Sequence, residues 1–390
     1  MGGHRSHGVD ALRGLAVLAV FAYHALLVAD LGASAWLSAL YGGRFSWFFP
    51  HQLGRLGVQL FFVVSGCCIH SAMRAWAQAH PGAPAAVQWR CYALRRFWRL
   101  GPLYAATLVL TFLALHPAPA TPAGATDLLV HAALLQTLVP VHINRINPSL
   151  WSLAVEVQLY ALYPLVWLVL QRLRGPRASP AGRTAVLLSM ALACLAWAVL
   201  APLLTRDDLL LHLPWRWGFE WLLGVLVAEC AARGRHAGGR LTLACGLAAV
   251  LVLAPLRVPA LVAALPPVCL ALLLSWTLAR ERRVAAAPAL PTVAACAVRA
   301  CRTGLAALGR VSYAFYLVHQ PLLSLPLPAW AVLPLAVATA WLLERWARRL
   351  QRAGLAAATP AGAEFTAVHT AAGQHRLAIR RPSLTSKEFR

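Results

Sequence analysis

Long apolar runs recur along almost the whole chain, and they constrain its fold more than any other feature. About 20 consecutive apolar residues suffice to cross the hydrocarbon core of a bilayer as a helix. Hydrophobic residues make up 60% of the 390 residues and charged residues only 12%. The sequence therefore predicts an all-α polytopic membrane protein. The candidate segments are 10–31, 47–72, 101–116, 127–142, 150–171, 184–204, 209–232, 241–256, 258–279, 304–325 and 329–347.

The basic charge of the chain fits a membrane protein better than a nucleic-acid binder. The formal net charge is +23, which in a soluble protein would suggest a nucleic-acid partner. Here the arginines gather in short connections between apolar segments, where basic residues mark the cytoplasmic side. We therefore expect the lipid bilayer as a partner and no nucleic acid.

The arginines also predict the topology. With the N-terminus inside, the basic stretch 90–99 is cytoplasmic. If segment 127–142 crossed the membrane, the arginines between 172 and 183 would lie outside; if it is re-entrant, they and every later basic cluster lie inside. The segment is short and carries His131 and Pro140, which suits non-spanning backbone buried in protein. We predict a bundle of about ten spans with one re-entrant segment and both termini in the cytoplasm.

The chain divides into a membrane domain and a tail. Residues 1–350 contain all the apolar segments, whereas residues 351–390 turn to Ala, Thr, Pro, Gln and Arg without periodicity. This composition predicts a disordered cytoplasmic tail. The nine cysteines form no CxxC pattern, so no metal site is expected.

Two ionisable residues share one face of the first apolar segment. Arg13 and His24 are 11 positions apart, which places them within about 20° of one meridian and about 16 Å apart along a helix. An ionisable side chain in a span is costly unless it faces a partner or a wet cavity. His24 is therefore a candidate functional residue, although a simple bond to a neighbouring helix would also explain it.

Further polar residues occur in three later segments. Arg95, Arg96 and Arg99 precede Pro102, and this spacing suits a bidentate grip on phosphates, while ordinary positive-inside charge explains the sign alone. The face of the fifth segment presents a hydroxyl, a carboxyl and a phenol four residues apart, and a carboxylate beside a histidine would hold its tautomer. The residues concerned are Ser152, Glu156 and Tyr160, and in a later segment Ser312, Tyr313 and a second intramembrane imidazole, His319.

Five short motifs follow one another between residues 9 and about 325. They read Asp10-x-Leu-Arg13-Gly with His24 eleven residues after the arginine, Gly57-Val-x-Leu-Phe-Phe-Val-x-Ser65-Gly66, Arg95-Arg96-x-x-Arg99-x-x-Pro102-x-Tyr104, Leu150-Trp-Ser-Leu-x-x-Glu156-x-Gln158-x-Tyr160 and Gly309-x-x-Ser312-Tyr313-x-x-Tyr316-x-x-His319-x-Pro321. In this order they resemble acyltransferase family 3 of membrane enzymes. Val157 stands where a second acid is frequent in the family, which leaves Glu156 as the candidate acid. Cys67 and Cys68 follow Gly66 where members often have an aromatic or aliphatic residue.

The resemblance implies transfer of an acyl group, often acetyl, from cytoplasmic acyl-CoA to a hydroxyl on a glycan, glycolipid or metabolite, in the inner membrane of a bacterium. Acyl-CoA would be a co-substrate, with no tightly bound cofactor. The expected CoA phosphate ligands are Arg13, Arg95, Arg96 and Arg99, with His24 as general base and Glu156 as its orienting or charge-matching partner. Alternatively, His24 is itself acylated. Candidates for the oxyanion or acceptor are Ser152, Tyr160, Ser312, Tyr313 and His319.

A second class of function explains the buried titratable groups equally well. In a proton-coupled secondary transporter, His24, Glu156 and His319 would form a proton relay without covalent chemistry. Such a transporter gives no reason for the Arg-x-x-Arg pattern beside a proline, and no inverted repeat is evident in the sequence.

Overall fold

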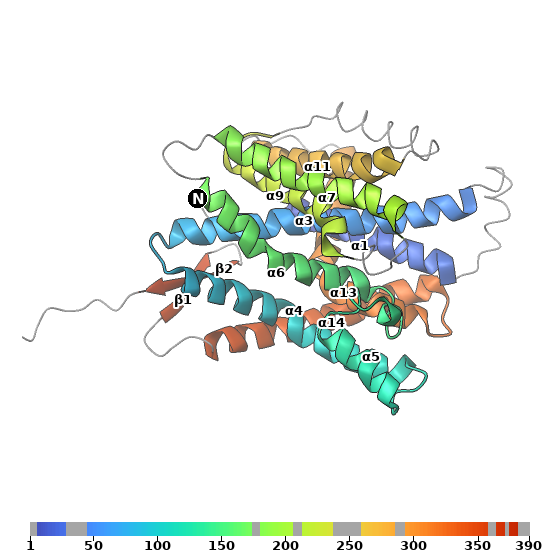
Figure 1. Ribbon diagram of the computed structural model, residues 1–390. Helices are drawn as coiled ribbons and strands as arrows, with labels where there is room; N and C mark the ends of the chain where they lie inside the picture. Colours follow the sequence, from blue (N-terminus) through green and yellow to red (C-terminus); the bar gives the residue numbers. More distant parts are fainter. Residues whose placement is uncertain are drawn as a thin grey trace, which may run out of the picture.

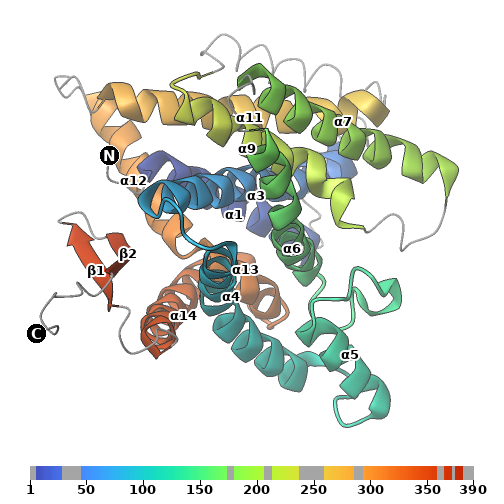
Figure 2. The same cartoon turned by 60° about the vertical axis from the view of Figure 1, so that its left-hand side comes forward.

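The computed structural model is a bundle of long helices packed side by side (Figures 1 and 2). It describes residues 6–28, 45–173, 180–205, 213–236, 259–284, 293–357, 364–370 and 374–380. Its helices are α1 (His7–Val28), α3 (Phe45–Ala79), α4 (Ala85–Leu115), α5 (Pro122–Ala132), α6 (Leu150–Arg172), α7 (Pro180–Leu204), α9 (Gly218–Ala232), α11 (Pro259–Val284), α12 (Val293–Arg310), α13 (Ser312–Leu323) and α14 (Ala329–Ala357). Two short 3₁₀ turns, η1 (Pro140–His142) and η2 (Pro214–Trp217), precede α6 and α9.

Glycines let the central helices approach closely. A side chain at Gly14 or Gly309 would collide with backbone of the facing helix, which brings α1 against α12. Gly66 and Gly224 join α3 to α9 in the same way, and Gly57 joins α3 to α1. Small residues at helix contacts are typical of membrane bundles, where close packing replaces the hydrophobic driving force. These four helices form the tightly packed centre of the molecule.

The central helices define two ends of the bundle. Because Tyr23 of α1 packs on Gly54 of α3, the end of α1 lies beside the start of α3. α9 runs parallel to α3, since Gln59 donates to Glu220 at 3.1 Å and His70 bonds Glu229 at 2.8 Å. We call the end with His24, Arg55 and Glu220 the histidine end. The opposite end, with Arg74, Arg183 and Arg233 around Glu229, is the arginine end.

The helical bundle predicted from the apolar runs is confirmed, but the count of ten spans is not. Within the described residues, six helices are long and apolar enough to cross a membrane: α1, α3, α4, α6, α7 and α11. α9, inside the predicted span 209–232, has only 15 residues. The predicted span 241–256 lies outside the described residues.

One predicted span is divided in two. Segment 304–325 contains the end of α12 and all of α13, with a break at Val311. α12 is amphipathic, and its residues 296–300 are exposed, including Arg299. The apolar pattern predicts one span here because the buried faces of both helices are hydrophobic. A change of direction leaves no trace in hydropathy.

The segment between α4 and α6 does not cross as one helix. α5 has 11 residues, which is about 16 Å of helix and half of a hydrocarbon core. Asp127 of α5 accepts hydrogen bonds from His116 at 3.0 Å and His142 at 2.5 Å. Burial raises the pKa of Asp127, but the bonds from His142 and His116 outweigh it and hold this pKa below its ordinary value. The non-spanning prediction for 127–142 agrees with this geometry.

The C-terminal part of the chain contains more regular structure than its composition indicates. α14 continues to Ala357, and β1 (Glu364–Thr370) pairs antiparallel with β2 (Gln374–Arg380), Glu364 opposite Arg380. This hairpin falls within 351–390, for which the sequence predicts a disordered tail. The division into domains at residue 350 stays a prediction.

Candidate active site

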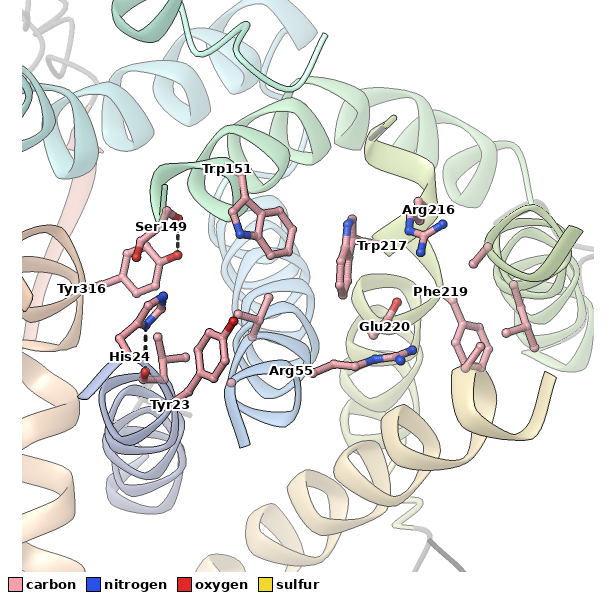
Figure 3. A pocket seen from close by; sticks show the side chains of 16 residues that line it. Tyr23, His24, Arg55, Ser149, Trp151, Arg216, Trp217, Phe219, Glu220 and Tyr316 are labelled. Carbon is pink, nitrogen blue, oxygen red and sulfur yellow. Dashed lines mark hydrogen bonds between the residues drawn. The ribbon is translucent and has the colours of Figure 1, made fainter. Parts of the chain in front are cut away.

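Two cavities lie in the bundle and meet at a shared wall. The larger, of about 430 Å³, opens toward the histidine end and contains His24 (Figure 3). The smaller, of about 120 Å³, lies on the side of the arginine end. Val58 and Tyr316 line both cavities. α1, α3 and α6 each contribute to both, so the two spaces follow one another along the helix axes.

His24 presents one ring nitrogen to the larger cavity. Its Nδ1 lies 2.9 Å from the carbonyl oxygen of Val20, and because a carbonyl only accepts, Nδ1 carries the proton. Nε2 of the neutral ring therefore holds a lone pair and has no hydrogen-bond partner among the described residues. An imidazole in this tautomer is arranged to accept a proton from a group in the cavity.

His319 of α13 stands behind His24. Its Nδ1 donates to the carbonyl of Tyr316 at 2.7 Å, so its Nε2 is an acceptor, 3.3 Å from Nδ1 of His24. Nε2 also lies 3.5 Å from the Ser149 hydroxyl, and the His319 side chain is fully buried. This second imidazole fixes the orientation of the first, so both histidines singled out by sequence meet in space.

Tyr316 closes the wall between the cavities. Its hydroxyl donates to the carbonyl of Ser149, and Ser152 in turn bonds to the Tyr316 hydroxyl at 2.6 Å. Because Ser149 precedes α6 and Ser152 lies in its first turn, this network attaches α13 to the start of α6. Tyr316, with two defined partners, therefore stands together with Val58 between His24 and the smaller cavity.

The smaller cavity holds the acid predicted as the partner of His24. Glu156 accepts a hydrogen bond from Tyr160, whose hydroxyl lies 2.8 Å from Ser65. No hydrogen bond or ion pair joins Glu156 to His24, both of which are described residues. The sequence placed Ser152, Glu156 and Tyr160 correctly on one helix face, but that face points mainly into the smaller cavity.

Three of the four predicted phosphate ligands line the smaller cavity, and the fourth does not. Arg13, Arg96 and Arg99 do so together with Ser312 and Tyr313. Arg99 forms an ion pair with Glu344 of α14, and its guanidinium lies 5.8 Å from the centre of the Tyr313 ring. Arg96 lies over the Tyr160 ring at 6.0 Å.

Arg95 points to another side of α4. It lines a narrow space of about 20 Å³ with Trp76, Gln88 and Tyr92. Adjacent residues on a helix are about 100° apart. Arg96 also borders this narrow space, but it lines the smaller cavity as well, whereas Arg95 does not. Arg13, which lines the smaller cavity, forms an ion pair with Asp10 at 3.9 Å.

Several residues of the larger cavity carry no motif that singled them out in the sequence. Arg55, Arg216 and Glu220 line its far side. In Figure 3, Trp151 and Trp217 lie between His24 and Arg216, and Tyr23 lies between His24 and Arg55. Arg55 and Glu220 lie in predicted apolar segments, so intramembrane charge was the available signal. Within the described residues, no group of three or more His, Cys, Asp or Glu side chains is arranged to hold a metal ion.

The bundle holds an unprotonated imidazole nitrogen in one cavity and arginines beside the next. These are features of a transferase that works within the membrane. The comparison with protein families agrees. The family model of acyltransferase family 3, described as an acyltransferase domain, matches residues 6–353, and the chain belongs to this family. Searches of curated proteins and of solved structures give no match. The protein is therefore an integral membrane protein of an acyltransferase family.

Proposed function

We propose that the protein transfers an acyl group from acyl-CoA, held at the smaller cavity, to a hydroxyl of an acceptor bound in the larger cavity. The observation that carries the proposal is the order of the two cavities, with arginines beside one, His24 in the other and Tyr316 between them. Arg13, Arg96 and Arg99 would hold the CoA phosphates by charge-assisted hydrogen bonds. The thin pantetheine arm would pass Tyr316 and bring the thioester to His24.

In the proposed reaction, Nε2 of His24 takes the proton of the acceptor hydroxyl. The oxygen then forms a bond to the thioester carbonyl carbon, the carbon–sulfur bond breaks, and the proton passes from the imidazolium to the departing thiolate. The products are an ester and free CoA. The competing route, in which His24 is acylated first and passes the group on, uses the same nitrogen as nucleophile.

The neighbours of His24 suggest roles that differ from those expected from sequence. His319 is proposed to orient His24, because it contacts the protonated Nδ1. Glu156 is proposed to balance Arg13 and Arg96 and to orient Tyr160, to which it is bonded. Ser152 is proposed as the oxyanion donor, for which its hydroxyl would have to turn from Tyr316, to which it is bonded, toward the thioester. Ser312 and Tyr313 would contact the donor.

The remaining features of the proposal come from the family resemblance and the charge distribution. We propose acetyl as the transferred group and a glycan, glycolipid or metabolite as the acceptor, with no tightly bound cofactor. The arginine end would face the cytoplasm, in a ten-span topology with both termini inside a bacterial inner membrane. The acyltransferase is preferred to a proton-coupled transporter, because no hydrogen bond joins His24 to Glu156 as a proton relay would require.

The test is the release of free CoA thiol from acetyl-CoA by the purified protein in detergent, with and without a crude glycan or lipid extract. We expect His24→Gln to lower the rate by about 10²–10⁴-fold, the usual value of general-base catalysis. Arg96→Gln should raise the KM for acetyl-CoA by about tenfold, since it removes one charge-assisted contact. The matched controls, His80→Gln and Arg352→Gln, change residues outside both cavities. Full activity in His24→Gln would contradict the proposal.

A further inference from the structure

The far side of the larger cavity contains more positive than negative charge. Arg55 of α3 and Arg216 of η2 line it together with one carboxylate, Glu220 of α9. One oxygen of Glu220 accepts a hydrogen bond from Gln59 at 3.1 Å, and the other is buried without a hydrogen-bond partner among the described residues. Two guanidinium groups therefore face a single carboxylate, which leaves the wall with an excess of one positive charge.

The two arginines have unused hydrogen-bonding capacity. Nε of Arg55 and Nη1 of Arg216 are buried and have no hydrogen-bond partner. Within the part of the chain that the structure describes, neither side chain forms an ion pair within 4.0 Å. Buried guanidinium groups without partners are costly, and more so near hydrocarbon. A bound anion would pair with the guanidinium nitrogens of Arg55 and Arg216 that face the cavity.

Aromatic side chains lie between these arginines and His24. The rings of Trp151 and Trp217 are 4.9 Å apart at an angle of 41°, and both line the cavity. Figure 3 shows His24 with Tyr316 on one side of the space, Arg216 and Glu220 on the other, and the two tryptophans between them. A ligand that reaches from His24 to Arg216 passes the indole rings, and aromatic walls favour a ring in the ligand.

We propose that the acceptor carries an anionic oxygen group, phosphate or carboxylate, which Arg55 and Arg216 bind while its hydroxyl lies at His24. Guanidinium groups match both anions through paired N–H donors. The ring that bears the hydroxyl lies against Trp151 and Trp217. Neutral acceptors lack the contact with the two arginines that would orient an anionic one. The proposal rests on the proposed function, because it describes the acceptor side of the same reaction.

The first experiment measures acetyl transfer to defined probes. The soluble probes are glucose, glucuronate and glucose 1-phosphate; the lipid probes are octyl glucoside and lyso-phosphatidylinositol. We expect kcat/KM for the anionic probes to exceed that for the neutral ones by at least about tenfold, the effect of one charged contact. Preference for the soluble or the lipid anion separates a metabolite or glycan acceptor from a glycolipid. Equal use of neutral and anionic probes would overturn the proposal.

The variants assign the effect to the two arginines. In Arg55→Gln/Arg216→Gln, the KM for the preferred anionic probe should rise at least about tenfold, while the KM for acetyl-CoA stays unchanged. Arg145→Gln is the matched control, because Arg145 is exposed and lies outside this cavity. A double variant that uses the anionic probe as well as the wild type would also overturn the proposal.

A binding measurement keeps the proposal separate from the reaction itself. Glucose 1-phosphate should raise the unfolding temperature of the wild type at constant ionic strength, and glucose should not, because a ligand stabilises the folded state that binds it. The double variant should lose this shift. If the shift is present but no thiol is released, the proposed reaction fails and the anion site stands. If the shift is absent from the wild type, the anion site fails whatever the activity.

Discussion

Arginine, histidine and glutamate occur at both ends of the bundle, but they are paired at one end and partly unpaired at the other. At the arginine end, Glu229 is fully buried and bonds His70 at 2.8 Å, Arg74 at 2.5 Å and Arg233 at 2.8 Å. At the histidine end, His24, Arg55 and Arg216 face an open cavity with polar atoms left unpaired. The paired charges at the arginine end join three helices, whereas the unpaired charges in the cavity are where we propose that a ligand binds.

The largest effect should come from breaking the satisfied cluster. Glu229→Gln leaves Arg74 and Arg233 without their counter-charge, and removing one partner of a buried ion pair costs about 3–5 kcal/mol. The free energy of unfolding in detergent should fall by that amount, and His24→Gln should leave it almost unchanged. Glu281→Gln is the control, since within the described residues its carboxylate accepts hydrogen bonds from Ser6 and Gly8 only and forms no ion pair. An equal loss of stability in Glu229→Gln and His24→Gln would remove the distinction between the regions.

Removing one arginine from each region should change the free energy of unfolding in opposite directions, and by less than Glu229→Gln does. Arg55→Met removes a buried donor that has no partner, and it should raise the free energy of unfolding by about 1 kcal/mol. Arg74→Met breaks the bond to Glu229 and should lower it by about 3 kcal/mol. Thermal unfolding of the two variants side by side measures the difference. If Arg55→Met destabilises as much as Arg74→Met, Arg55 is a structural residue.

The smallest effect concerns a third carboxylate, Asp127, which has two histidine partners outside the long helices. Its pKa is held below the ordinary value, so the ionised form stabilises the fold. This contribution is present above the pKa of the unfolded chain, near 4, and is lost as the pH falls below it. Asp127→Asn should lower stability at pH 7 by about 1 kcal/mol, the net value of a hydrogen bond. It should also flatten the acid limb of the unfolding-temperature profile, and an unchanged limb would contradict the assignment.

Much of the candidate site follows from periodicity within single helices. The shared face of Arg13 and His24, and the row from Ser152 to Tyr160, both appear as expected from helical geometry. Spacing along one helix does not give the depth at which a neighbouring helix presents its side chains. For that reason the sequence predicts Glu156 as the partner of His24, whereas in the structure Glu156 lines the smaller cavity and bonds Tyr160.

The parts of the site that were missed depend on contacts between distant segments. Glu344 holds Arg99 across 245 positions of sequence, and Arg216 reaches the cavity from a short 3₁₀ turn. Neither residue stands in a motif. The division of 304–325 into α12 and α13 was missed for a related reason, because hydropathy records burial but not direction.

The glycine contacts of the central helices also determine where the larger cavity can change shape. α1 and α3, which carry His24 and Arg55, touch backbone to backbone at Gly57 and cannot approach or slide without a collision. The facing wall, with Trp151 of α6 and Trp217 of η2, meets the centre through side chains, which can change rotamer. Acceptors of different size would therefore be accommodated by the tryptophan wall, while the reacting nitrogen and the arginine keep their spacing. Broad acceptor range and fixed chemistry are compatible in such a cavity.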